Sequence, residues 1–133
     1  MKRKDHCLDF TDDFIDLDAI KDKILSKPQK NEDKILSYLK SGHFVWLIRA
    51  LAFDWFLPEN LDFLSGESPY KPVRSVRVHI YTDGEWNWDT VLTYYVENYH
   101  YKVSDEFVEH MKKNNWQVPQ LTKKQIKSIF KGS

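Results

Sequence analysis

The sequence contains a single cysteine, Cys7, so one chain can form neither an internal disulfide nor a zinc site with several thiolate ligands. Its four glycines are scattered singly, and none belongs to the Gly-rich loops that bind phosphates or dinucleotides. The His-Glu-x-x-His pair of zinc hydrolases is also missing. These gaps remove the common sequence signs of a cofactor or a metal ion, and we expect neither.

Long apolar runs are lacking as well. The longest apolar-rich segment, residues 44–57, is interrupted by Arg49 and Asp54, and it is too short to span a bilayer as a helix. The basic N-terminus is followed by acidic residues rather than by the apolar run of a signal peptide. We therefore expect a cytoplasmic protein that does not associate with membranes.

Net charge is also lacking, because 20 lysines and arginines balance 20 aspartates and glutamates. Dedicated nucleic-acid-binding domains are normally strongly basic, so direct binding to nucleic acid is not expected. The charges are nevertheless segregated: residues 5–18 hold six aspartates and no lysine or arginine, whereas residues 112–131 hold six lysines and no acid. Such an asymmetry can steer a charged partner, although both segments can also be ordinary solvated surface.

The composition is that of a folded protein, with 41% apolar and 30% charged residues. A chain of 133 residues is long enough for one domain with its own core. We expect one domain over residues 1–133, in which residues 1–10 are loose.

Apolar residues spaced three and four apart predict helices at residues 17–25 and 32–40. Asn31 is the expected cap of the second helix, and Gly42 is expected to end it in the left-handed conformation. Later helices are predicted to begin after three residues that are good N-caps: Asp89, Ser104 and Thr122.

Alternating apolar and polar residues at 75–81 predict a half-buried strand. The dipeptide Asp83-Gly84 is a strong signal for a two-residue hairpin turn, in which both residues have positive φ. Residues 85–88 would form the return strand, with Trp86 and Trp88 on one face, packed against the following helix.

Residues 43–57 fit either a buried helix or one or two buried strands. The aromatic content and the flanking Gly42 and Pro58 favour strands. The resulting fold class is α+β, or a small α/β fold, with a short antiparallel sheet and four to five helices packed on it.

Catalytic chemistry has few candidates. His79 and His100 could serve a small, metal-independent ribonuclease, because general acid–base cleavage of RNA needs only two such groups. Glu97 and His100 have the spacing of a carboxylate-bridged metal site, but such sites need two copies of the pair, so an exposed helical pair is favoured. We therefore expect that the protein is not an enzyme.

The segment at 82–107 resembles a family of short bacterial immunity proteins from polymorphic-toxin and contact-dependent growth inhibition loci. The family pattern is a Thr-Asp-Gly-Glu-Trp-x-Trp hairpin, then Leu-x-Tyr-Tyr-Val and Tyr-His, then a Glu-Phe helix, although Asp89 and Ser104 stand where the family has prolines. The resemblance implies a protein that neutralises a cognate toxin. It also implies that the following pattern residues are scaffold: Asp83, Gly84, Trp86, Trp88, Tyr95, Tyr99 and His100.

The partner is predicted to be a basic protein toxin, such as a nuclease, because an acidic surface would oppose a phosphate-binding one. A generic protein-interaction module is the main alternative. The predicted partner-binding residues are acidic and come from the N-terminal segment and from the loop after residue 53: Asp9, Asp12, Asp13, Asp16, Asp18, Asp54 and Glu59.

Overall fold

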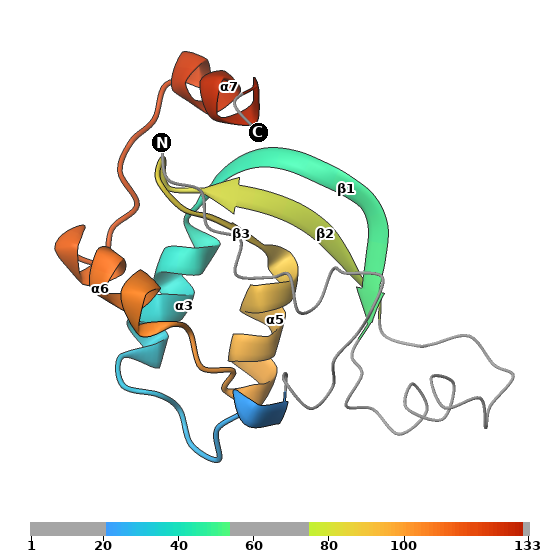
Figure 1. Cartoon of the computed structure of the whole chain (residues 1–133), viewed down its shortest axis with the longest axis vertical. Coiled ribbons are helices and arrows are strands. Elements are labelled where there is room, and N and C mark those ends of the chain that lie inside the picture. Colours follow the sequence, from blue (N-terminus) through green and yellow to red (C-terminus); the bar gives the residue numbers. More distant parts are fainter. Residues whose placement is uncertain (1–20, 54–74, 132–133) are drawn as a thin grey trace, which may run out of the picture.

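The computed structural model describes residues 21–53 and 75–131 (Figure 1). These residues form an α+β fold with a three-stranded antiparallel sheet, which confirms the predicted fold class. In Figure 1, α3, α5 and α6 lie on one side of the sheet, and α7 lies beyond β1 on the other. The four helices named within the described ranges are α3 (Glu32–Lys40), α5 (Thr90–Tyr99), α6 (Asp105–Lys113) and α7 (Lys123–Lys131).

The strands are ordered β1-β2-β3, with β1 at His43–Phe53, β2 at Ser75–Thr82 and β3 at Asn87–Asp89. The register of β1 shifts between Phe44 and Trp46 and again between Ile48 and Leu51. Such irregularities increase local twist, in agreement with the strong curvature of β1 in Figure 1. Residues 43–53 are therefore a strand, while residues 54–57 of the ambiguous segment lie outside the described residues.

The hairpin turn lies one residue later than predicted. Asp83 N donates to Trp86 O at 3.2 Å, so Gly84 and Glu85 are the central residues. Gly84 has φ of 106°, and within this turn it alone has positive φ. The expectation that Asp83 and Gly84 both have positive φ is therefore wrong for Asp83. The Asp83 side chain causes the difference, because its Oδ1 accepts from Glu85 N and Trp86 N and holds Asp83 before the turn.

The predicted caps of the three later helices are confirmed. Asp89 accepts from the backbone N–H groups of Val91 and Leu92, which begins α5. Ser104 accepts from Phe107 N at 3.3 Å at the start of α6. Thr122 and Gln125 form a reciprocal capping box before α7, with distances of 2.7 Å and 3.1 Å.

The first predicted helix, at residues 17–25, ends earlier than expected. The helical residues that the structure describes here stop at Asp22, and Ile24 instead forms a β-bridge with Tyr101. Leu25 N donates to His100 O, and Lys102 N donates to Lys23 O. Backbone pairing with the segment after α5 therefore replaces the last turn of the helix. Residues 17–20 lie outside the described residues.

Trp86 and Trp88 belong to one buried core cluster, together with Leu92 and Tyr95 of α5. Their closest described ring partner belongs to α6 rather than to α5. Trp86 stacks on Phe107 with ring centroids 4.6 Å apart, and Trp88 lies 5.5 Å from the same ring. Trp88 also donates from Nε1 to Leu39 O at 2.9 Å, so it links β3 to α3.

The two ends of α3 differ from the sequence prediction. Asn31 precedes the helix with φ of 62° and ψ of 26°, and its side chain makes no capping hydrogen bond. Gly42 does not adopt the left-handed conformation. Of the glycines in the described residues, Gly84 alone has positive φ. Glycine is needed at position 42 for space: a Cβ there would overlap the Trp88 ring and lie 2.9 Å from Tyr81 Cβ.

The Gly42→Ala variant is therefore expected to lower the free energy of unfolding by about 1–3 kcal/mol, the usual cost of overpacking a well-packed core. Chemical denaturation of both proteins measures this difference. A variant as stable as the wild type would contradict the close packing of residue 42 against Trp88.

Candidate functional site

The carboxylate of Asp83 is buried beside the turn and has hydrogen-bonding partners at both of its oxygens. Its Oδ1 accepts from Glu85 N at 2.9 Å and from Trp86 N at 2.8 Å. Its Oδ2 accepts from Tyr38 Oη at 2.5 Å and is 2.8 Å from His110 Nε2. These four contacts fill the acceptor capacity of a carboxylate, so Asp83 is satisfied without solvent.

Tyr38 links this carboxylate to α3 and to the end of α6. Its hydroxyl donates to Asp83 and accepts from Asn114 Nδ2 at 2.9 Å. Burial raises the pKa of Tyr38 far above its usual range, and the hydrogen bond to Asp83 adds to the increase, because both disfavour the phenolate. We call Asp83, Tyr38, His110 and Asn114 the Asp83 network. It joins α3, the hairpin turn and α6.

His110 of this network reaches the surface with 12% of its side chain exposed, and Asn114 is also partly exposed. His110 Nδ1 lies 3.9 Å from Glu85 Oε2, and the His110 ring centroid lies 5.7 Å from that of Trp86. An open depression of about 580 Å³, which we call the His110 hollow, is lined by Glu85, Trp86, Glu106, Glu109, His110, Lys112 and Lys113. The hollow therefore combines a fixed imidazole with charges of both signs.

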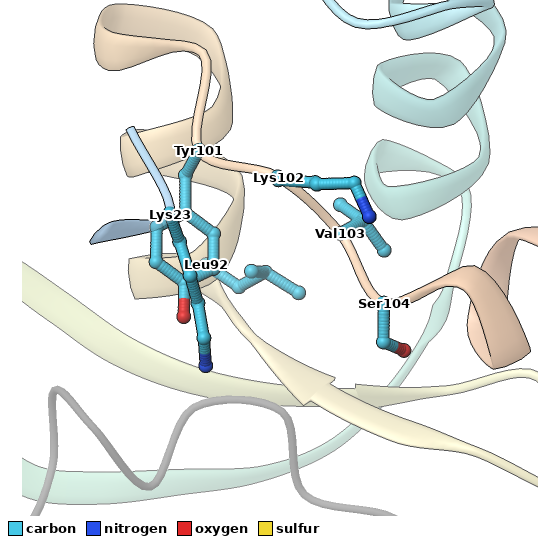
Figure 2. Close-up of a pocket in the computed structure, with 6 residues that line it drawn as sticks. All are labelled: Lys23, Leu92, Tyr101, Lys102, Val103 and Ser104. Atoms are coloured by element: carbon cyan, nitrogen blue, oxygen red, sulfur yellow. The ribbon is translucent and has the colours of Figure 1, made fainter. Parts of the chain in front are cut away.

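A second pocket, of about 160 Å³, lies between the segment before α3 and the start of α6. Figure 2 shows Lys23 alongside the Tyr101 ring on one side and Ser104 on the other, with Leu92 between them. Lys23 Nζ is 5.6 Å from the Tyr101 ring centroid, and Lys102 Nζ is 3.1 Å from Asp105 Oδ1. The second pocket has room for a small group, but its lysine Lys102 is already paired.

His100 pairs with an acid other than the predicted one. It ends α5 with φ of 55°, and its Nδ1 is 2.8 Å from Glu32 Oε2. Glu97 instead contacts Lys40 of α3. Glu32 is 8% exposed, so its carboxylate lies in the interior of the protein.

His79, the other residue of the ribonuclease hypothesis, lies on β2. Its Nδ1 is 3.4 Å from Tyr81 Oη, and its ring centroid is 5.6 Å from that of Phe44. None of the described contacts of His79 is shared with His100. Phe44 is 53% exposed. Among the residues whose burial the structure describes, it is the one large apolar side chain that is exposed.

The residues of the family pattern lie largely in the core. Asp83, Trp86, Trp88 and Tyr95 are buried, Gly84 forms the turn, and Tyr99 is half-buried. The predicted partner-binding residues lie outside the described ranges: Asp9, Asp12, Asp13, Asp16, Asp18, Asp54 and Glu59.

Sequence reasoning missed three members of the Asp83 network, namely Tyr38, His110 and Asn114. His110 and Asn114 follow Phe107 by three and seven residues, so they extend the buried stripe of α6. Tyr38 follows the buried Ile35 by three residues on α3. Polar residues at stripe positions were the available signal that these side chains face inward.

Within the described ranges, no three histidine, cysteine, aspartate or glutamate side chains are placed to hold a metal ion. None of the helices described here has the length and apolar character needed to cross a membrane. Comparisons with protein-family models, with curated proteins and with solved structures found no significant match.

Proposed function

We propose that this protein is an immunity protein, a non-catalytic inhibitor that binds and neutralises one cognate bacterial toxin, and that the toxin is a basic nuclease. The resemblance of the segment at 82–107 to such proteins motivates the proposal. The observation that carries it is the Asp83 network. The pattern carboxylate uses its full acceptor capacity inside the protein, as expected of a scaffold rather than of a catalytic group.

The contacts of His79 and His100 support the same proposal. His79 contacts Tyr81 and Phe44, whereas His100 is held by the carboxylate of Glu32, so their neighbourhoods differ. A general acid–base pair needs both groups within reach of one substrate. The ribonuclease alternative is tested by incubating the purified protein with RNA: cleavage that is lost in His79→Ala or His100→Ala would overturn the proposal.

Co-expression with the open reading frame immediately upstream tests the proposal in cells. We expect that the upstream product alone arrests growth, and that this protein restores growth and co-purifies with that product. Continued arrest in its presence, together with no complex on purification, would contradict the proposed function.

The acidic N-terminal segment is proposed to accelerate association with the toxin. The triple variant Asp12→Asn, Asp13→Asn and Asp16→Asn should slow association and flatten its salt dependence, because long-range attraction between opposite charges acts mainly on the association rate. Stopped-flow measurements at low and high salt check this, with thermal unfolding as the control for the fold. Unchanged association rates at low salt would shift the proposed surface to the loop that contains Asp54 and Glu59.

Phe44 supports the alternative of a generic interaction module. An aromatic side chain that is 53% exposed beside His79 and Tyr81 can anchor a partner protein. Such a module typically binds several partners weakly, whereas an immunity protein binds one partner tightly. The Phe44→Ala variant should therefore reduce binding to several partners if the alternative holds.

A further inference from the structure

We propose that the His110 hollow receives an arginine side chain of the partner, whose guanidinium donates hydrogen bonds to His110 Nδ1 and to the Glu85 carboxylate. This inference rests on the proposed function, because the arginine belongs to the toxin. It assigns the hollow a ligand chemistry that the acidic N-terminal segment does not provide.

The buried Asp83 carboxylate determines which nitrogen of His110 can accept. Asp83 Oδ2 lies 2.8 Å from Nε2, and a carboxylate can only accept, so Nε2 carries the hydrogen. If Nε2 carried no hydrogen, its lone pair would face a lone pair of Asp83 Oδ2 at 2.8 Å, and the two would repel each other. In a neutral imidazole the other nitrogen, Nδ1, is then an acceptor. Asn114 Nδ2 is 3.4 Å from Nε2, and it donates to Tyr38 Oη at 2.9 Å.

Glu85 supplies the second acceptor. Its Oε2 lies 3.9 Å from His110 Nδ1, which is too long for a hydrogen bond, and 64% of its side chain is exposed. Within the described ranges, Glu85 makes no contact of ion-pair length with a lysine or an arginine. Glu109, in contrast, is 3.2 Å from Lys112 Nζ, so its charge is already countered within the hollow.

Two neighbouring acceptors on a rigid support favour arginine over lysine. The guanidinium presents five N–H donors in a planar fork, so it can donate to an imidazole nitrogen and a carboxylate together. The ammonium of lysine is a compact point charge without that geometry. Because Asp83, which Tyr38 holds in place, fixes His110 before the partner arrives, little side-chain freedom is lost on binding. The open volume of about 580 Å³ leaves room for the side chain.

The first experiment needs no toxin. The imidazole ¹⁵N resonances of His110 are followed by NMR during titration with Nα-acetyl-L-arginine methylamide, with the uncharged citrulline analogue as the control probe. We expect a saturable shift of Nδ1 with the arginine derivative only, and about tenfold weaker binding to Glu85→Gln. The Glu97→Gln variant is the matched control, because Glu97 is an exposed carboxylate paired with Lys40. Equal shifts with both probes, or equal binding to Glu85→Gln and wild type, would overturn the inference.

The second experiment uses the toxin and separates the two proposals. Glu85→Arg should weaken toxin binding by at least about tenfold, whereas Glu97→Arg should leave it unchanged. An arginine-to-glutamate variant of the toxin should restore binding to Glu85→Arg. Tight binding that Glu85→Arg does not affect would overturn the arginine site and leave the proposed function standing. A toxin that binds no form of the protein would refute the proposed function, while the NMR result would still decide whether the hollow recognises arginine.

Discussion

Replacing Trp88 with alanine is expected to lower the free energy of unfolding by about 3–5 kcal/mol, the usual cost of truncating a buried tryptophan. Trp88 is 1% exposed, contacts the rings of Phe107 and Tyr38, and donates to Leu39 O. Truncation therefore leaves a cavity between β3, α3 and α6, and it also leaves the Leu39 carbonyl without this donor. Urea denaturation of the two proteins measures the loss.

Phe44→Ala is the matched control, because it truncates an aromatic side chain that is 53% exposed. We expect it to change stability by less than about 1 kcal/mol. The cavity left by Trp88→Ala should also accommodate a methyl group at position 42. In the wild type, a Cβ at this position would overlap the Trp88 ring. Gly42→Ala should thus cost less in the Trp88→Ala background than in the wild type. Equal losses for Trp88→Ala and Phe44→Ala would show that Trp88 does not hold the core together.

The Asp83→Asn variant is expected to lower the free energy of unfolding by about 2–6 kcal/mol, because two buried donors lose their acceptor and each such loss costs about 1–3 kcal/mol. An asparagine keeps the shape but has one oxygen and one NH2 group. It can accept from the backbone N–H groups of Glu85 and Trp86 or from Tyr38 and His110, but not from both sets. One set of donors is therefore left without an acceptor.

Two further variants are expected to lose less stability than Asp83→Asn, and denaturation curves can test this order. Tyr38→Phe removes one donor from the network and should cost about 1–3 kcal/mol. Glu97→Gln breaks an exposed pair with Lys40 and should cost about 0–1 kcal/mol. If Asp83→Asn lowered the free energy of unfolding no more than Glu97→Gln does, the Asp83 network would not be a main source of stability.

The parts of the fold that the sequence predicted depend on neighbouring residues. Asp89, Ser104 and the Thr122–Gln125 pair cap helices through bonds that span two or three residues, so local chemistry is sufficient to identify them. The alternation at residues 75–81 likewise predicted β2. The α+β class followed from these elements together.

The parts that the sequence did not predict depend on distant residues. Asp83 looked like a turn residue, and the local pattern gave no sign of its partners Tyr38 and His110, which lie 45 and 27 positions away. Gly42 was assigned to a helix end by its position, whereas Trp88 determines the need for glycine there. Residues 23–25 left the helical pattern because their backbone pairs with the segment after α5. The His110 hollow follows from the same distant contacts.

The affinity of the purified protein for the purified product of the upstream open reading frame tests the central proposal most directly. Isothermal titration calorimetry at physiological salt should give a one-to-one complex with a nanomolar or tighter dissociation constant, and the same stoichiometry should abolish the activity of the toxin. Micromolar or undetectable binding, or a bound toxin that remains active, would contradict the proposal that this protein is an immunity protein.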